Sequence, residues 1–212
     1  MRFDAGYAED ETLRDGTAVR LRLVRPEDAA QLARGLERLS PESRYRRFLS
    51  ARTSFLPGEL DYLTRVDGVH HVAIIAVRLD RKAETDGIGI ARFVEIAPRV
   101  AEPAIVVLDE HQRKGLGRML LERLHDAAVE RGIETFQAEV LVTNTPMRAI
   151  LVQIGATEVH GVDEGVMDVA IPLGPLGLAP HGRDHPLHLF LGLAARGSLA
   201  LRGILKQRHA PE

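Results

Sequence analysis

The sequence contains no cysteine among its 212 residues. Disulfide bonds, thiolate nucleophiles and cysteine-ligated metal sites are therefore excluded. A large charge of either sign is also missing, because 28 lysines and arginines stand against 30 aspartates and glutamates, for a formal net charge of −2. This balance provides no overall attraction to nucleic acid.

Long uncharged apolar runs are absent as well. The first residues, Met1-Arg2-Phe3-Asp4, have no apolar signal core, and no run is long and uncharged enough to span a bilayer. A hydrophobic fraction of 45% is nevertheless ordinary for a soluble globular protein with a real core. We therefore expect a cytoplasmic protein.

Several enzyme signatures are missing from the chain. It has no G-x-x-x-x-G-K-[ST] phosphate loop, and Gly115-Leu116-Gly117 lacks the third glycine of a dinucleotide-binding turn. The G-x-S-x-G elbow of many serine hydrolases is also absent. The nine histidines show no metal-ligand spacing on an expected helix. No metal site is therefore expected.

The chain does carry a regular series of helix and strand patterns. In Thr17–Val24, Val19 and Leu21 alternate with Arg20 and Arg22, which predicts a half-buried strand with the arginines facing solvent. Further strands are expected over residues 70–77, 87–96, 104–108, 136–142, 157–162 and 166–171, with a hairpin turn over 78–86. Helices are expected over residues 26–39, 44–48, 57–66, 115–131 and 146–154. This order predicts a mixed α/β fold.

Three segments are expected along the chain. Residues 1–16 are polar and predict a loose N-terminal lead-in, residues 17–173 form the main domain, and residues 174–212 form a proline- and glycine-rich linker and a helix. Within the last segment, residues 187–207 place apolar side chains on one helical face and basic ones opposite. We expect this amphipathic helix to dock on its own domain or on a second copy, in preference to a membrane.

The most informative segment is residues 109–120, which follow the apolar run Ala104–Leu108. The run lacks alternation and predicts a fully buried strand. A basic, glycine-containing turn then opens a helix, and such a turn directs backbone N–H groups and the positive end of a helix dipole toward one point, which suits a phosphate. Taken alone, Gly115 and Gly117 are equally consistent with a tight strand-to-helix connection.

The pattern Gln112-x-x-Gly115-x-Gly117 resembles the pyrophosphate signature of the GNAT superfamily of N-acetyltransferases. The order of expected elements from Thr17 to Leu173 is also similar to that family's order. The resemblance implies a central, mostly antiparallel sheet of about six to seven strands, splayed at the cofactor site, with helices on both faces. It also implies acetyl-CoA as the cofactor and direct attack of an amine on the thioester.

The resemblance assigns cofactor-binding residues to the strand before the turn and to the turn itself. A backbone N–H of the strand polarises the thioester carbonyl in this family. Asn144, in Asn144-Thr145-Pro146, matches an asparagine beside the pantetheine arm and is also a good helix N-cap. The assigned residues are Ile105, Val106, Val107, Gln112, Arg113, Lys114, Gly115, Leu116, Gly117, Arg118 and Asn144.

Other stretches resemble the Pat-type protein lysine acetyltransferases of the family. They include Arg25-Pro26-Glu27-Asp28 and Ser40-Pro41-Glu42-Ser43-Arg44-Tyr45. A lysine amine has a pKa of about 10.4 and arrives protonated, so a base is needed. Glu102, in Ala101-Glu102-Pro103-Ala104, resembles that group's catalytic glutamate, and Glu95 is the second candidate.

Two other functions remain open at this point. The acceptor is expected to be a protein lysine, but a small amine or an amino acid fits the same chemistry. Leu151 stands where many members have a tyrosine that protonates the leaving thiolate. That replacement favours a catalytically weak module that binds acyl-CoA and regulates a partner.

Overall fold

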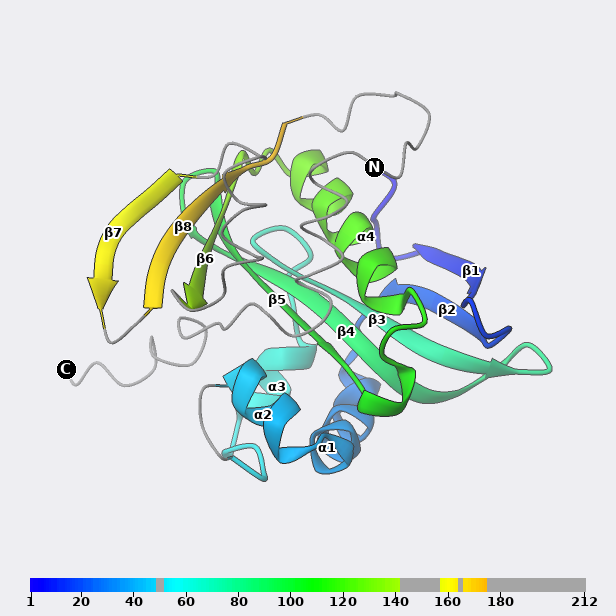
Figure 1. The fold of residues 1–212 in the computed structure, drawn as a ribbon. Helices are drawn as coiled ribbons and strands as arrows, with labels where there is room; N and C mark the ends of the chain where they lie inside the picture. The colour runs from blue at the N-terminus through cyan, green and yellow to red at the C-terminus, as the bar shows by residue number, and fades with distance from the viewer. Residues whose placement is uncertain (49–51, 142–156, 164–165, 175–212) are drawn as a thin grey trace.

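The computed structural model describes residues 1–48, 52–141, 157–163 and 166–174 (Figure 1). Its strands are β1 Ala8–Thr12, β2 Ala18–Leu23, β3 His71–Asp80, β4 Ala83–Ala97, β5 Val100–Val107, β6 Thr135–Leu141, β7 Thr157–Asp163 and β8 Val166–Pro172. Its helices are α1 Ala29–Arg38, α2 Pro41–Phe48, α3 Glu59–Thr64 and α4 Leu116–Glu130, with 3-10 turns η1 Pro26–Asp28 and η2 Asp109–His111.

These strands form an eight-stranded sheet in the order β1-β2-β3-β4-β5-β6-β8-β7. Every neighbouring pair is antiparallel except β5 and β6. Helix α4 lies across one face of the sheet, and α1, α2 and α3 lie on the other (Figure 1). The expected mixed, mostly antiparallel fold with helices on both faces is confirmed.

Helix α4 packs closely on the centre of the sheet because its inner face is apolar. Leu116, Leu120 and Leu124 are fully buried, as the helical spacing predicts. On the sheet below, a Cβ atom at Gly89 would lie 3.1 Å from Leu120 Cδ1 and 3.3 Å from Leu116 Cδ2. The absence of a side chain at Gly89 therefore allows the helix to approach β4.

The expectation of a loose lead-in over residues 1–16 is wrong. Residues 8–12 form the edge strand β1, which accounts for the eighth strand. Phe3 is 1% exposed and belongs to the main core, and the main-chain N–H of Phe3 donates to Glu130 of α4. The strand is further fixed by Arg123 of α4, whose guanidinium bonds both Glu9 oxygens at 2.9 Å. Charged side chains of this segment pair with helix α4, so the segment's polarity does not mean disorder.

Two further expectations need correction. The turn predicted over residues 78–86 is confined to Arg81 and Lys82, with φ values of 47° and 71°. Two successive left-handed residues suit a two-residue hairpin, but this pair lacks the usual asparagine and glycine that would have marked it. Arg22, expected to face solvent, is only 3% exposed because Asp28, at the start of α1, covers it and neutralises its charge.

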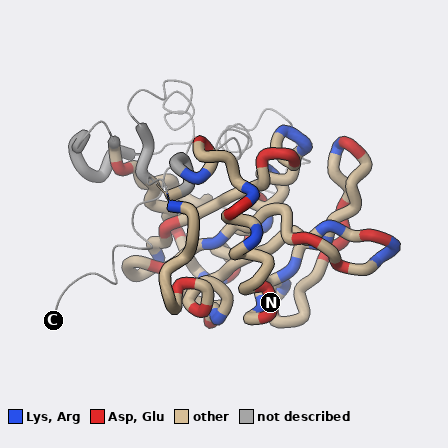
Figure 2. Tube along the Cα trace, turned by 90° about the horizontal axis from the view of Figure 1, so that it is seen from below, with Lys and Arg blue, Asp and Glu red and all other residues tan. Residues whose placement is uncertain are grey.

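No helix in the described ranges combines the length and apolar character needed to cross a bilayer. Acidic and basic residues are interspersed along the described trace (Figure 2). The electrostatic potential around each site is therefore set by local ion pairs and not by an excess of one charge over the whole surface.

Candidate active site

The sheet opens between β5 and β6. These parallel strands pair only at Val100↔Thr135 and Ala101↔Phe136. From Glu102 onward, β6 runs beside β8 and provides no register partner for β5 in the described residues. The splay that the resemblance implies is therefore present, and it exposes one edge of β5.

The ladder between β4 and β5 shows which main-chain groups face this opening. The N–H of Leu108 donates to the Ile88 carbonyl at 3.0 Å, so the main-chain groups of Leu108 point toward β4. Since successive residues alternate, Val106 also pairs with β4, while the N–H groups of Ile105 and Val107 point toward the opening. The main chain of Pro103 also faces away from β4. The missing N–H of this proline therefore costs no hydrogen bond between β4 and β5.

The three strand residues assigned to the cofactor differ in the direction of their main-chain N–H groups. Ile105 and Val107 present main-chain donors to the open edge. Val106 turns its main chain to β4 and instead contributes a side chain to a pocket on the opposite side from α4. Ile105 and Val106 are only partly buried, which differs from the fully buried strand expected from the sequence, because the opening and the pocket lie beside them.

The turn after β5 leads directly into α4. Gly115 is the N-cap of the helix and has φ 96°, a conformation that suits glycine. Leu116, Gly117 and Arg118 form the first helical turn, where N–H groups have no intrahelical acceptor. The turn therefore places the first N–H groups of the helix beside the positive end of the helix dipole, as predicted.

Gln112 fixes this turn to its surroundings. Its side-chain amide donates to the Val107 carbonyl at 3.1 Å and to the Ser43 hydroxyl of α2 at 3.3 Å. Gln112, the first residue of the signature, thus links the turn to both β5 and α2. The sequence alone does not show this contact.

The basic side chains of the turn differ in their surroundings. Lys114 pairs with Asp15 at 2.8 Å, and this contact lowers the pKa of Asp15 below its ordinary value. Arg118 pairs with Glu122 at 2.7 Å on the next helical turn. Arg113 is exposed and has φ 61°. Two of the three cations assigned to phosphates thus already contact carboxylates, which leaves the main chain as the better-organised donor set.

The two candidate bases lie on opposite faces of the sheet. Glu102 of β5 is 8% exposed and pairs in register with Val94, on the face that carries α1 to α3. Glu95 lies on the other side of β4 and accepts hydrogen bonds from His70 Nδ1 at 2.5 Å and the Arg99 N–H at 3.0 Å. The His70 contact, followed by the Arg99 N–H, lowers the pKa of Glu95.

A buried polar group that the sequence analysis missed lies near Glu102. Arg92 is 3% exposed and donates to the Leu63 carbonyl at 3.2 Å; its Nη1 is also 3.2 Å from His71 Nε2. Burial, and then Arg92, lower the pKa of His71 to about 4, so the imidazole is neutral and accepts. The sequence analysis did not single out His71 or Arg92, although an arginine inside an apolar strand was an available signal.

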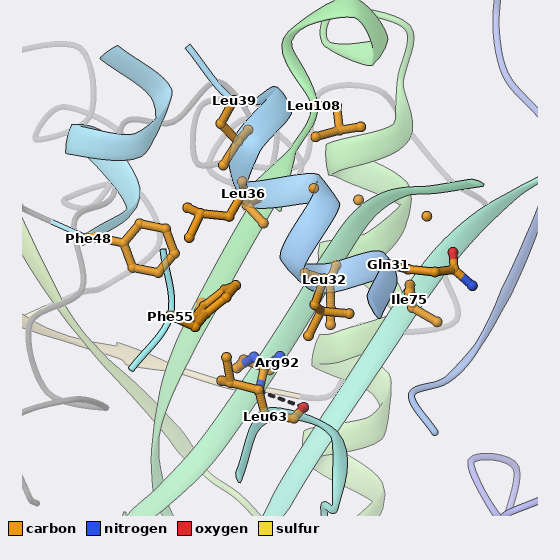
Figure 3. A pocket seen from close by; sticks show the side chains of 16 residues that line it. Gln31, Leu32, Leu36, Leu39, Phe48, Phe55, Leu63, Ile75, Arg92 and Leu108 are labelled. Atoms are coloured by element: carbon orange, nitrogen blue, oxygen red, sulfur yellow. Dashed lines mark hydrogen bonds between the residues drawn. The ribbon is translucent and has the colours of Figure 1, made fainter. Parts of the chain in front are cut away.

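An apolar pocket lies between α1–α3 and the sheet (Figure 3). One wall consists of Ala104 and Val106 of β5 and of Leu108, which follows the strand. Arg92 is the charged residue among the described lining. The remaining side-chain lining is Gln31, Leu32, Leu36, Leu39, Phe48, Phe55, Leu63, Ile75 and Ile90. The pocket therefore touches the strand on both sides of Ile105.

Three sequence-based assignments lie outside the described residues. They are Asn144, the Leu151 replacement and the amphipathic helix over residues 187–207. These assignments stay predictions.

Comparisons with known proteins agree with this geometry. The profile of the acetyltransferase (GNAT) family matches residues 42–155, and the chain belongs to this family. It is 33% identical over 170 residues to Acetyltransferase Pat of Mycolicibacterium smegmatis, covering 79% of this chain and 50% of that protein. It is 30% identical over 146 residues to an acetyltransferase of Pseudomonas aeruginosa, covering 68% of this chain and 78% of the relative.

A solved structure shows the same similarity. The crystal structure of the GNAT domain of S. lividans PAT superposes with a TM-score of 0.67 at 30% identity, over 80% of this chain and 99% of that domain. The resemblance to Pat-type members of the GNAT family is confirmed. Acetyl-CoA is the acetyl donor of this family. The chain spans about half the length of the Mycolicibacterium relative.

Proposed function

We propose that the chain is an acetyl-CoA-dependent N-acetyltransferase whose acceptor is a protein lysine. One observation carries the proposal: the edge of β5 opens from β6 and leads through Gly115 into the N-terminus of α4. A single stretch, from Ile105 to Arg118, therefore offers strand amides and helix amides to one ligand. This arrangement fits a molecule with a carbonyl at one end and a pyrophosphate at the other.

The main-chain donors divide between these two ends. The N–H groups of Leu116 and Gly117 would hold the pyrophosphate, and the helix dipole would add to their attraction. The Ile105 N–H would donate to the thioester oxygen, and this bond would strengthen as negative charge develops during attack. Bound acetyl-CoA supplies the acetyl group as an activated thioester.

We assign Glu102 as the base. The carboxylate is buried on the α1–α3 face, the face on which Val106 reaches the pocket. It would take a proton from the incoming ammonium group, so that the neutral amine can attack. Glu95 is the weaker candidate because it lies on the other face of the sheet, away from the pocket.

The lysine acceptor rests on the likeness to Pat-type proteins, at 33% identity to one of them. Asn144 is assigned to the pantetheine arm on the same basis. The C-terminal helix is assigned to docking on the domain or on a second copy. The lysine acceptor is checked by the mass shift of acetylated acceptors, and Asn144 by the cofactor affinity of Asn144→Ala. The C-terminal helix is checked by the oligomeric state after removal of residues 187–212.

The activity test follows thiol release from acetyl-CoA with a panel of protein and small-amine acceptors. Wild type should turn over a protein acceptor, and Glu102→Gln should lose about 100-fold or more in kcat with unchanged cofactor affinity. Glu95→Gln is the matched control and should retain activity. Tight cofactor binding without turnover on any acceptor would instead support a regulatory acyl-CoA-binding module.

The cofactor assignment has its own test. Gly117→Glu places a negative charge in the first turn of α4 and should abolish acetyl-CoA binding in calorimetry. Val129→Glu adds the same charge at an exposed position near the other end of the helix and should bind normally. Equal binding by both variants would contradict the pyrophosphate position.

A further inference from the structure

We propose that the apolar pocket between α1–α3 and the sheet receives the acyl chain of the donor thioester and accommodates chains longer than acetyl. This inference rests on the proposed function, because it takes the thioester carbonyl to lie at the Ile105 N–H. It extends that function by naming the substrate class and a residue that determines it.

The position of the pocket is the first argument. Ala104 and Val106 both line it, and they are the neighbours of Ile105 on β5. Their side chains share one face, while the Ile105 N–H points along the sheet into the opening. An alkyl chain leaving a carbonyl at Ile105 toward this face therefore meets the pocket at once.

The chemistry of the lining is the second argument. Leucine, isoleucine, valine and phenylalanine side chains make up most of it (Figure 3). The charged residue among the described lining is Arg92, a cation. An ammonium group would lose its hydration among these apolar side chains, whereas an alkyl chain gains from leaving water. Glu102, to which the acceptor's ammonium group is assigned, does not belong to this lining. The pocket thus suits the donor's acyl chain better than the acceptor's ammonium group.

Gly35 provides the third argument. It lies inside helix α1 and lines the pocket, and a Cβ atom at this position would meet no atom within 4 Å beyond its chain neighbours and the adjacent helix backbone. A glycine weakens the interior of a helix relative to alanine. Its presence leaves open the space that a side chain would fill, which makes residue 35 the determinant of acyl-chain length.

The distal wall is held firmly in place. Phe48 and Phe55 meet edge to face with ring centroids 6.3 Å apart. The Arg52 guanidinium lies 5.1 Å from the Phe48 centroid and 5.3 Å from that of Phe55, and it pairs with Glu59. These contacts fix the wall, so the pocket has a defined depth.

The test compares binding of acetyl-CoA and butyryl-CoA by calorimetry, and then their turnover with one acceptor. Two extra methylene groups, fully buried, should favour butyryl-CoA by up to roughly fifteenfold in wild-type affinity. Gly35→Leu should remove this preference while leaving acetyl-CoA affinity within about twofold. Gly35→Ala is the matched control and should retain most of the preference. Thermal unfolding should show both variants at least as stable as wild type, because each improves the helix.

The outcomes separate the two proposals. Acetyl-CoA binding with no chain-length preference in wild type, or a preference unchanged in Gly35→Leu, would overturn the acyl-pocket inference alone. An acceptor KM that Gly35→Leu raises equally for both donors would also overturn it, since the pocket would then hold the acceptor. No binding of any CoA thioester would contradict the proposed function itself.

Discussion

The side-chain amide of Gln112 donates to the main-chain carbonyl of Val107 across 3.1 Å. Val107 lies at the end of the open edge of β5, and Gln112 begins the turn that leads to α4. The contact therefore sets the position of the helix donors relative to the strand donors. It accounts for a glutamine in the signature without requiring this side chain to touch a phosphate.

Gln112→Ala should weaken acetyl-CoA binding about fivefold to tenfold, because the loss of this hydrogen bond, worth about 1 kcal/mol, loosens the turn. Calorimetry measures the effect. Ser43→Ala leaves the contact between Gln112 and Val107 in place and is the milder control; it removes the 3.3 Å contact of Gln112 with α2 and the hydrogen bond from the Ser43 hydroxyl to Asp109. Unchanged affinity in Gln112→Ala would show that the turn holds its shape without this side chain.

Two arginines on β2 should differ in their contribution to stability. Arg22 contacts both Asp28 oxygens at 2.8 Å in a buried pair, whereas Arg20 contacts the exposed Asp10. Arg22→Met should lower the free energy of unfolding by about 3–5 kcal/mol, because it leaves a buried carboxylate without its partner. Arg20→Met should cost about 1 kcal/mol or less. Urea unfolding of the two variants checks the difference, and similar losses would be inconsistent with it.

His71 should make stability depend on pH. Burial and Arg92 lower its pKa to about 4 in the folded protein, while the unfolded chain keeps about 6.5. Between these values the unfolded chain binds more protons, so the contribution is fully present above pH 6.5 and is lost as pH falls toward 4. The loss should approach about 3 kcal/mol.

Urea unfolding of wild type and His71→Gln from pH 7 to pH 4 measures this effect. Glutamine retains an acceptor for Arg92 but does not titrate in this range. The difference between the two stability curves should therefore shrink or reverse as pH falls. Parallel curves would mean that His71 is not buried as a neutral ring.

Phe3→Ala should destabilise the protein by about 3–5 kcal/mol, because the ring is 1% exposed within the main core and packs 4.6 Å from the Tyr7 ring. Met1→Ala is the control, since that side chain is 76% exposed and should contribute little. Equal thermal unfolding of the two variants would restore the expectation of a loose lead-in.

Much of the domain could be predicted from local patterns. The helical spacing of Leu116, Leu120 and Leu124 identified the buried face of α4, and the apolar run before Gly115 identified the strand that precedes it. These patterns work because burial imposes a repeat on consecutive residues. The signature residues Gln112, Gly115 and Gly117 lie together because they belong to one short connection between β5 and α4.

The remaining features depend on contacts between distant segments. Edge strand β1 is polar in sequence but is held by Arg123 of α4, and Arg22 is buried because α1 supplies Asp28. The role of Gln112 and the placement of Glu102 and Glu95 on opposite faces required the register of the sheet. Local sequence patterns do not encode these pairings.

The central claim is that main-chain amides from β5 and the start of α4 bind the donor. The most direct measurement is a titration of ¹⁵N-labelled protein with acetyl-CoA, followed by amide chemical shifts. The largest changes should occur at Ile105, Val107 and Gly115 through Gly117, while Val106, whose N–H faces β4, should change less. Saturable binding that leaves these amides unshifted would contradict the account.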